Sequence, residues 1–139
     1  MSDAARGDAD HCFVCGPRNP IGLKLAFRVE GERCFGEFTS RPEHAGFDGV
    51  THGGIVFAVL DDAMANWFFL QGGRGFTAKA EIRYRAPMPV GATAAIACEV
   101  VKRKGRLLQL EARAQDAADG TLFAESSASF MLDDGSPLA

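Results

Sequence analysis

The sequence predicts an α+β domain in which a curved antiparallel sheet wraps around one long helix. The stretch from residue 55 to residue 70 is apolar almost throughout, which is typical of a helix buried among other elements. Shorter segments on either side alternate in polarity or are bounded by turns that contain glycine, as antiparallel strands do. The economical way to bury the helix and one sheet face together is to fold the sheet over the helix.

Two strands are expected before the helix. Residues 23–29 alternate between apolar and other side chains, as a half-buried strand does. A turn at Gly31 then leads to residues 34–38, which are expected to be the hairpin partner. Residues 41–49 contain a proline and two glycines without any sustained periodicity, and therefore predict a connecting loop.

Four strands are expected after the helix. Alanine, methionine and leucine favour the helix over residues 55–70, and the glycines that follow residue 71 are of the kind that end helices. Short turns divide the remainder of the chain and imply an antiparallel meander. The predicted strands cover residues 76–86, 92–102, 107–115 and 122–132.

Composition indicates a single globular domain. The chain has 139 residues, 47% hydrophobic and 24% charged, which is enough to bury a core. A net charge of -3 argues against nucleic-acid binding, and no apolar run is long enough to span a bilayer. The N-terminus lacks the pattern of an export signal, so we expect a cytoplasmic protein. Residues 1–10 are small and polar and predict a flexible tail before one domain over residues 11–139.

The four cysteines, Cys12, Cys15, Cys34 and Cys98, are expected to be thiols, as is usual in a reducing cytosol. The spacing of Cys12 and Cys15 suits zinc, but a structural zinc site usually takes a second ligand pair, which this sequence lacks. A redox motif of this spacing would open a helix, whereas residues 16–20 have the composition of a loop. We therefore predict no metal and no cofactor.

A glycine pair before the helix and an acid two turns inside it form the candidate site. The first amides of a helix have no partner within it and lie at the positive end of its dipole. Gly53 and Gly54 have no side chain, so a ligand carbonyl can approach these amides and be polarised. Asp61 has apolar neighbours, and burial raises the pKa of a carboxyl group, which makes Asp61 a candidate base or nucleophile. The alternative is a structural role for Asp61 and Asp62 in a wet groove or at a subunit contact.

Gly53 and Asp61 are expected to act together across a subunit interface. They are eight residues apart, about 12 Å along a helix, which is too far for one small reacting centre. If two copies of the helix lie antiparallel across a two-fold axis, Gly53 of one subunit faces Asp61 of the other. We therefore predict a homodimer or a dimer of dimers. Asp62 lies about 100° around the helix from Asp61 and is expected to face solvent or an interface.

Several short motifs of the chain occur together in one known family. They are Cys12–Gly16, Asn19–Leu23, His52–Gly54 followed after six residues by Asp61, Leu60–Met64 and Tyr84–Pro87. In these motifs the chain resembles the hot-dog-fold thioesterases of the 4-hydroxybenzoyl-CoA and phenylacetyl-CoA type, from about residue 12 to residue 132. The resemblance implies a hot-dog fold and an acyl-CoA thioesterase that hydrolyses an acyl- or aryl-CoA to free acid and CoA.

The resemblance also implies roles for individual residues. Gly53 would present the amide that polarises the thioester carbonyl, and Asp61 of the other subunit would attack that carbonyl or activate water. Thr77 occupies the place where relatives use serine or threonine to position the water or the acid. His52 would organise the loop by bonding the backbone, and with Gly54 it would help to bind the substrate.

The phosphates of CoA are expected to meet basic residues near the site. Arg83 and Arg85 alternate with other residues and should share one strand face, and the arginine fork suits phosphate. Arg103 belongs to a charged turn over residues 102–106, which is a further candidate, although such a turn is ordinarily a solvated hairpin tip.

Two other functions stay open at this point. Active relatives commonly carry Asn or Gln six or seven residues before the histidine of the motif, where this chain has Ala45 and Gly46. That difference favours a non-catalytic module that binds acyl-CoA or a small ligand on the same fold. A hydratase-like enzyme of the same fold, which pairs a histidine with an acid differently, is the third candidate. The sequence does not specify the acyl group.

Overall fold

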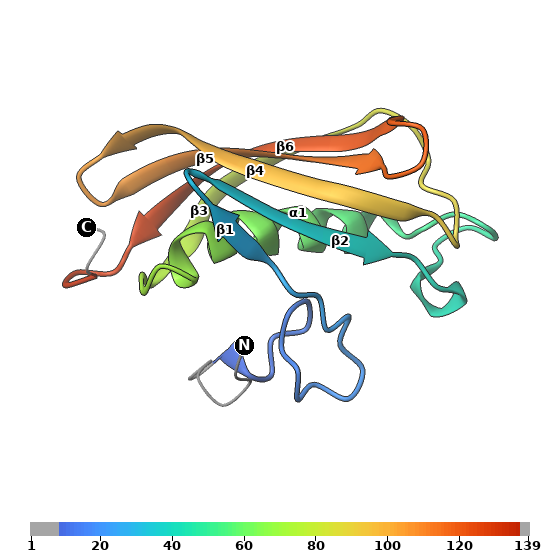
Figure 1. The fold of residues 1–139 in the computed structure, drawn as a ribbon, viewed down its shortest axis with the longest axis horizontal. Helices are drawn as coiled ribbons and strands as arrows, with labels where there is room; N and C mark the ends of the chain where they lie inside the picture. The colour runs from blue at the N-terminus through green and yellow to red at the C-terminus, as the bar shows by residue number, and fades with distance from the viewer. Residues whose placement is uncertain (1–8, 137–139) are drawn as a thin grey trace.

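In the part of the chain that the structure describes, six antiparallel strands and one long helix make up the fold, as expected from the sequence (Figure 1). The computed structural model describes residues 9–136, so residues 1–8 of the predicted tail lie outside the described part. The helix α1 covers Gly53–Phe69, and a short 3-10 turn covers Pro42–His44. The strands are β1 (Arg28–Glu30), β2 (Arg33–Thr39), β3 (Gly75–Tyr84), β4 (Thr93–Lys104), β5 (Leu107–Asp116) and β6 (Leu122–Leu132).

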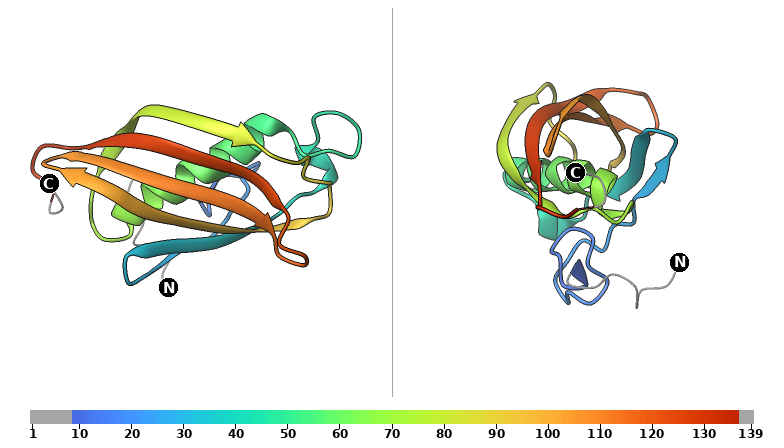
Figure 2. Two further views of the ribbon diagram at one scale, coloured as in Figure 1. Left: turned by 90° about the horizontal axis from the view of Figure 1, so that it is seen from above. Right: turned by 90° about the vertical axis from the view of Figure 1, so that its left-hand side faces the viewer.

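The strands form one curved sheet in the order β1-β2-β4-β5-β6-β3, and every neighbouring pair is antiparallel. Seen end-on, the sheet wraps around α1, which contacts all six strands (Figure 2). The helix carries the chain from β2 on one side of the sheet to β3 at the far edge. This arrangement is the predicted sheet around a central helix, and it leaves β3 as an edge strand.

The core lies between α1 and the concave face of the sheet. Phe68 of α1 packs edge-on against Phe130 of β6, with ring centroids 5.5 Å apart. Burying each such side chain stabilises the fold by about 1.5–3 kcal/mol. The fully buried large side chains of this core include Leu60, Met64, Leu108, Leu110, Phe130 and Leu132.

Within residues 9–136, no helix combines the length and apolar character needed to cross a membrane.

The predicted first strand is wrong in its extent, because β1 begins only at Arg28. The backbone amide of Leu23 donates to Phe13 O at 2.8 Å, and that of Leu25 donates to Val14 O at 2.9 Å. Residues 23–25 are therefore bonded to an earlier segment rather than to β2. A positive φ of 55° at Lys24 also interrupts the extended backbone. The alternating apolar residues Leu23 and Leu25, which predicted a strand, pack against the core from a loop instead.

We call residues 9–25 the N-terminal loop. In Figure 1 it lies on the side of α1 that the sheet leaves open. Val14 and Cys15 of this loop are buried and belong to the hydrophobic core. The loop is thus part of the packed domain, and it covers a portion of the helix that the sheet does not reach.

Candidate functional site

The loop before α1 is held in place by its own backbone and by two histidines. His52 caps the helix: its Nδ1 accepts a hydrogen bond of 2.8 Å from the amide of Gly54. The amide of His52 donates to His44 O, and His44 Nδ1 accepts from the amide of Arg41 at 2.9 Å. Burial lowers the pKa of His44, which favours the neutral ring that such an acceptor requires. His52 therefore contacts the backbone, as the resemblance implied.

The amides of the glycine pair differ in availability. That of Gly54 is engaged by His52 and is not directed to a ligand. That of Gly53 is the first of the helix and has no acceptor within it. Among residues 9–136 no hydrogen-bond acceptor is found for it. Gly53 is therefore the donor that this helix N-terminus offers.

A pocket of about 710 Å³ opens beside Gly53. Its lining is mostly apolar and comes from the loop before α1, from the start of α1 and from the segment after β3. Tyr84, at the end of β3, donates a hydrogen bond of 2.7 Å to Gly53 O and so joins the strand to the helix N-terminus. Gly46 also lines the pocket, and a Cβ there would lie 3.2 Å from His52 Cα. A longer side chain at residue 46 would require the loop to move.

Asp61 and Thr77 are brought together by the fold, although Asp61 belongs to the helix α1 and Thr77 to the strand β3. Thr77 Oγ1 donates a hydrogen bond of 2.8 Å to Asp61 Oδ1. Burial raises the pKa of Asp61 above its ordinary value, and the hydrogen bond from Thr77 opposes that rise. The side chain of Asp61 is only partly covered, so the carboxylate is accessible next to the edge strand.

A β-bulge in β3 explains how Thr77 faces the helix. Thr77 lies opposite Phe130, which points into the core, whereas Lys79 lies opposite Ser129 on the outer face. In a regular strand these two side chains would share a face. The register shift between them inserts one extra residue, so Thr77 points inward and Lys79 outward. A regular alternation pattern does not reveal this change.

The structure does not bring Gly53 and Asp61 together within one chain. Both belong to the same uninterrupted helix, in which Gly53 is the first residue and Asp61 lies at the middle. Their separation along the axis is therefore about 12 Å. A site that uses both groups on one carbonyl needs a second copy of the helix.

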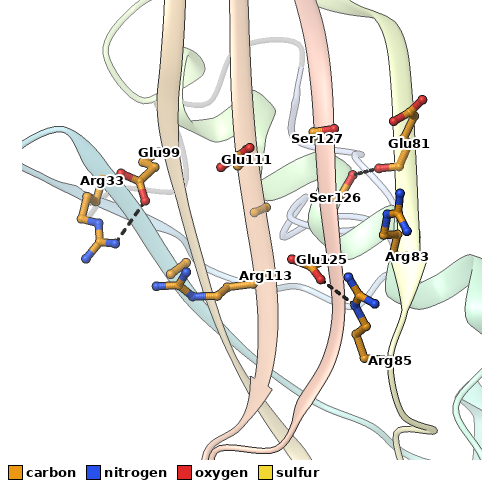
Figure 3. A pocket seen from close by; sticks show the side chains of 12 residues that line it. Arg33, Glu81, Arg83, Arg85, Glu99, Glu111, Arg113, Glu125, Ser126 and Ser127 are labelled. Carbon is orange, nitrogen blue, oxygen red and sulfur yellow. Dashed lines mark hydrogen bonds and ion pairs between the residues drawn. The ribbon is translucent and has the colours of Figure 1, made fainter.

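The three predicted phosphate-binding arginines lie in different places. Arg83 and Arg85 share the outer face of the sheet, where they line a shallow pocket of about 260 Å³ (Figure 3). Arg85 Nε is paired with Glu125 Oε2 at 2.6 Å, and Arg85 also reaches the lining of the larger pocket beside Gly53. Arg103 lies by the β4–β5 turn, at the end of β4 remote from Gly53. The structure therefore separates Arg103 from the other two within the chain.

Asp62 lies under the N-terminal loop, so the solvent-facing position that the sequence analysis offered for it is wrong. The N-terminal loop covers it: Cys12 Sγ lies 3.3 Å from Asp62 Oδ1, and Asn66 Nδ2 donates to Asp62 Oδ2 at 2.9 Å. Burial raises the pKa of Asp62 to about 7. One ligand atom each from Cys12, Cys15 and Asp62 lie within 4.8 Å of one another. The C-x-x-C motif was the only sequence signal for this cluster, because contact between distant segments is tertiary information.

Comparison with known proteins identifies a family and several relatives that this chain resembles. The family model described as "Thioesterase superfamily" matches residues 48–123. Acyl-coenzyme A thioesterase THEM5 of Mus musculus is 30% identical over 94 residues, which cover 68% of this chain and 38% of that protein. The chain thus spans well under half the length of the curated relatives that it matches.

Two solved structures illustrate the likeness of the fold. The crystal structure of protein RHA08564, a thioesterase superfamily protein, superposes with a TM-score of 0.80 at 23% identity, covering 88% of this chain and 60% of that one. A hypothetical thioesterase protein with coenzyme A, from Streptococcus pneumoniae TIGR4, gives a TM-score of 0.72 at 14% identity, covering 78% and 85%. That pneumococcal protein has also been solved with an aspartate and with a threonine changed to alanine. Those two positions are as far apart in its sequence as Asp61 and Thr77 are here.

Proposed function

The chain belongs to the thioesterase superfamily, and from this membership we propose that it hydrolyses an acyl- or aryl-CoA thioester to a free acid and CoA. The observation that carries the proposal is the contact between Thr77 and Asp61. The contact orients an accessible carboxylate with a raised pKa, and the first amide of the same helix, that of Gly53, has no acceptor among residues 9–136. The matching spacing of the altered aspartate and threonine in the pneumococcal protein supports the same pair.

The proposed site is shared between two subunits. Because Asp61 lies at the middle of α1, a second helix running antiparallel can place its Gly53 opposite that carboxylate. The surface along β3 supports such pairing, because β3 is an edge strand and carries exposed Phe76 near Asp61 and exposed Tyr84 near Gly53, at 59% and 53% exposure. The assembly would be a homodimer or a dimer of dimers with two equivalent sites per dimer.

The chemistry follows from these positions. The Gly53 amide and the positive end of the helix dipole stabilise the negative charge that develops on the thioester oxygen. Asp61 of the other subunit either attacks the carbonyl carbon or removes a proton from the attacking water. If Asp61 acts as the base, the activated water adds to the carbonyl carbon, the C–S bond breaks, and the CoA sulfur leaves and gains a proton. If Asp61 attacks, the C–S bond breaks to give a mixed anhydride between Asp61 and the acyl group, and water then cleaves that anhydride to the free acid and the regenerated carboxylate. Thr77 holds the carboxylate in the orientation that this step needs.

The substrate enters, in this proposal, through the pocket beside Gly53. Its apolar lining suits the part of the thioester next to the carbonyl, and His52 and Gly54 keep the loop at its mouth in place. Arg85 lines the same pocket and is the first candidate for a CoA phosphate, with Arg83 beside it on the outer face. Arg103 would contribute only from a different copy of the chain.

The direct test is hydrolysis of a panel of CoA thioesters by the purified chain. We expect release of free CoA, detected by a thiol reagent, from at least one member of a panel of benzoyl, phenylacetyl and fatty-acyl derivatives. A second candidate is a binding module without turnover, which the lack of an amide side chain at Ala45 and Gly46 favours. Saturable binding of CoA thioesters without any release of CoA would establish that function in place of hydrolysis.

Thr77 gives a finer test of the same site. Changing Thr77 to valine removes the hydroxyl but keeps the branched shape, and we expect kcat to fall by about 10- to 100-fold with little change in KM. Changing Thr77 to serine keeps the hydroxyl and should restore most of the rate. Equal rates for the valine and serine variants would show that the hydrogen bond to Asp61 is only structural.

A further inference from the structure

A second group of reactive side chains lies on a different face of α1 from the contact between Asp61 and Thr77. It is built by the N-terminal loop. The amide of Gly16 donates to Cys12 O at 2.8 Å and closes a tight turn, and the amide of Cys15 points to Cys12 Sγ at 3.5 Å. A Cβ at Gly16 would lie only 2.3 Å from Cys12 N, so this turn requires glycine. The turn directs both thiols of the C-x-x-C motif to the same side.

The helix supplies the third group at that position. Asp62 Oδ1 lies 3.3 Å from Cys12 Sγ, and the three ligand atoms of Cys12, Cys15 and Asp62 all lie within 4.8 Å of one another. Asn66, one turn further along α1, donates both to Asp62 Oδ2 at 2.9 Å and to Cys15 Sγ at 3.7 Å. Asn66 thus orients Cys15 and Asp62 through hydrogen bonds, as residues next to metal ligands commonly do.

We propose that Cys12, Cys15 and Asp62 bind one divalent transition-metal ion of the zinc type, with water in the fourth position. Two thiolates, one carboxylate and an open position are an accepted ligand set for tetrahedral zinc. With Zn–S bonds of about 2.3 Å, tetrahedral geometry requires ligand atoms about 3.5–3.8 Å apart. The distance between Cys12 Sγ and Asp62 Oδ1 is already close to this, and the remaining pairs need to move by about 1 Å at most.

The composition of the cluster favours a cation. Two thiols and one carboxyl group, each of which becomes an anion when it loses its proton, lie within 4.8 Å of one another in a partly buried space. A bound dication would offset the negative charge that these groups acquire on ionisation.

The consequence of metal binding would be a link between the N-terminal loop and the helix. The ion would join residues 12 and 15 to residue 62, which are distant in the sequence, and would stabilise the folded chain in proportion to its occupancy. The proposal concerns neither the pocket beside Gly53 nor the hydrolysis of thioesters. The failure of one proposal leaves the other standing.

Cobalt(II) provides a direct probe, because it replaces zinc and its thiolate complexes absorb light. The full chain is purified under reducing conditions, treated with a chelator and titrated with Co²⁺. We expect a sulfur-to-cobalt charge-transfer band and strong tetrahedral d–d bands that saturate at one ion per chain and are lost when Zn²⁺ is added. Zinc should also raise the Tm of the chelated protein.

Variants assign the ligands. The double variant Cys12→Ser with Cys15→Ser should lose the charge-transfer band, whereas Cys34→Ala and Cys98→Ala, which change the cysteine pair between β2 and β4, should keep it. Asp62→Asn is nearly isosteric: its amide oxygen can still accept the hydrogen bond from Asn66, and its NH2 group can donate to Cys12 Sγ. It should weaken cobalt binding by at least about 10- to 100-fold.

Three results would overturn the proposal. The first is the absence of cobalt bands in the wild-type chain, including the case in which mass spectrometry shows a disulfide between Cys12 and Cys15 instead. The second is retention of the bands in the double serine variant. The third is an unchanged affinity of the Asp62→Asn variant for Co²⁺. This third result tests the proposal even if the double serine variant fails to fold.

Discussion

Changing Asp61 to asparagine is expected to lower kcat/KM for thioester hydrolysis by about 10²- to 10⁴-fold. Asparagine has the same shape and can still accept the hydrogen bond from Thr77, so the fold should be retained. It can neither take a proton from water nor attack a carbonyl carbon efficiently, and the reacting group is therefore lost without loss of structure. Steady-state kinetics with the best substrate of the panel, together with the Tm of both proteins, measures the effect.

A matched control separates the role of the acid from the general effect of charge. Glu37→Gln removes an exposed carboxylate from β2, away from the pocket, and should leave the kinetics as they are. If Asp61→Asn hydrolyses the substrate as fast as the wild type, the proposed role of Asp61 is wrong. If the Tm of Asp61→Asn also falls strongly, Asp61→Glu separates the two causes, because it changes the packing but keeps the carboxylate.

Changing Gly53 to proline is expected to reduce kcat by about 10²- to 10³-fold, the usual effect of removing one oxyanion donor. Proline lacks the backbone N–H, and it is well tolerated at the first position of a helix, which Gly53 occupies. The preceding residue, His52, has φ -58° and ψ 130°, a conformation that a following proline favours. The variant should therefore lose the donor and keep the helix.

Gly53→Ala is the control for the added bulk. Its Cβ would lie 3.3 Å from Tyr84 Oη, a contact that proline shares, but it keeps the N–H. We expect the alanine variant to lose much less activity than the proline variant. Equal losses in both would mean that the contact with Tyr84, rather than the amide, governs the rate.

The two variants together test whether the site is shared. In a mixed dimer of one Asp61→Asn chain and one Gly53→Pro chain, one site receives both changes and the other receives neither. Such a dimer, isolated with two different affinity tags, should have about half the wild-type activity although each parent is inactive. Mixed dimers as inactive as the parents would place Gly53 and Asp61 in the same site of one chain.

The fold was predictable because it depends on patterns that are local in the sequence. The apolar stretch over residues 55–70 corresponds to α1 at Gly53–Phe69, and the three turns after it separate the four strands β3 to β6 close to their expected limits. Patterns of this kind report which face of an element is buried. They do not report which partner buries it, and for this reason Leu23 and Leu25 were assigned to a strand although their backbone amides bond to Phe13 and Val14 within the N-terminal loop.

The site was predictable only in part, for two physical reasons. The inward direction of Thr77 depends on a bulge, and simple alternation would place its side chain on the same face as that of Lys79. The environment of Asp62 depends on a loop about 50 residues earlier in the sequence. The resemblance indicated Thr77 through the family's use of a hydroxyl residue, whereas nothing in the sequence connected Asp62 with Cys12.

The position of β3 at the edge of the sheet also constrains the order in which the chain can fold. Among the strands that the structure describes, β3 pairs only with β6, so its hydrogen bonds wait until residues 122–132 have left the ribosome. Until then β4 and β5 can form a hairpin, but one flank of α1 has no cover and its apolar side chains stay exposed to other molecules. Closure of the core thus becomes a late event with contacts of high sequence separation, which slows folding. A nascent chain that stalls before Leu132 would be a target for chaperones rather than a partly working protein.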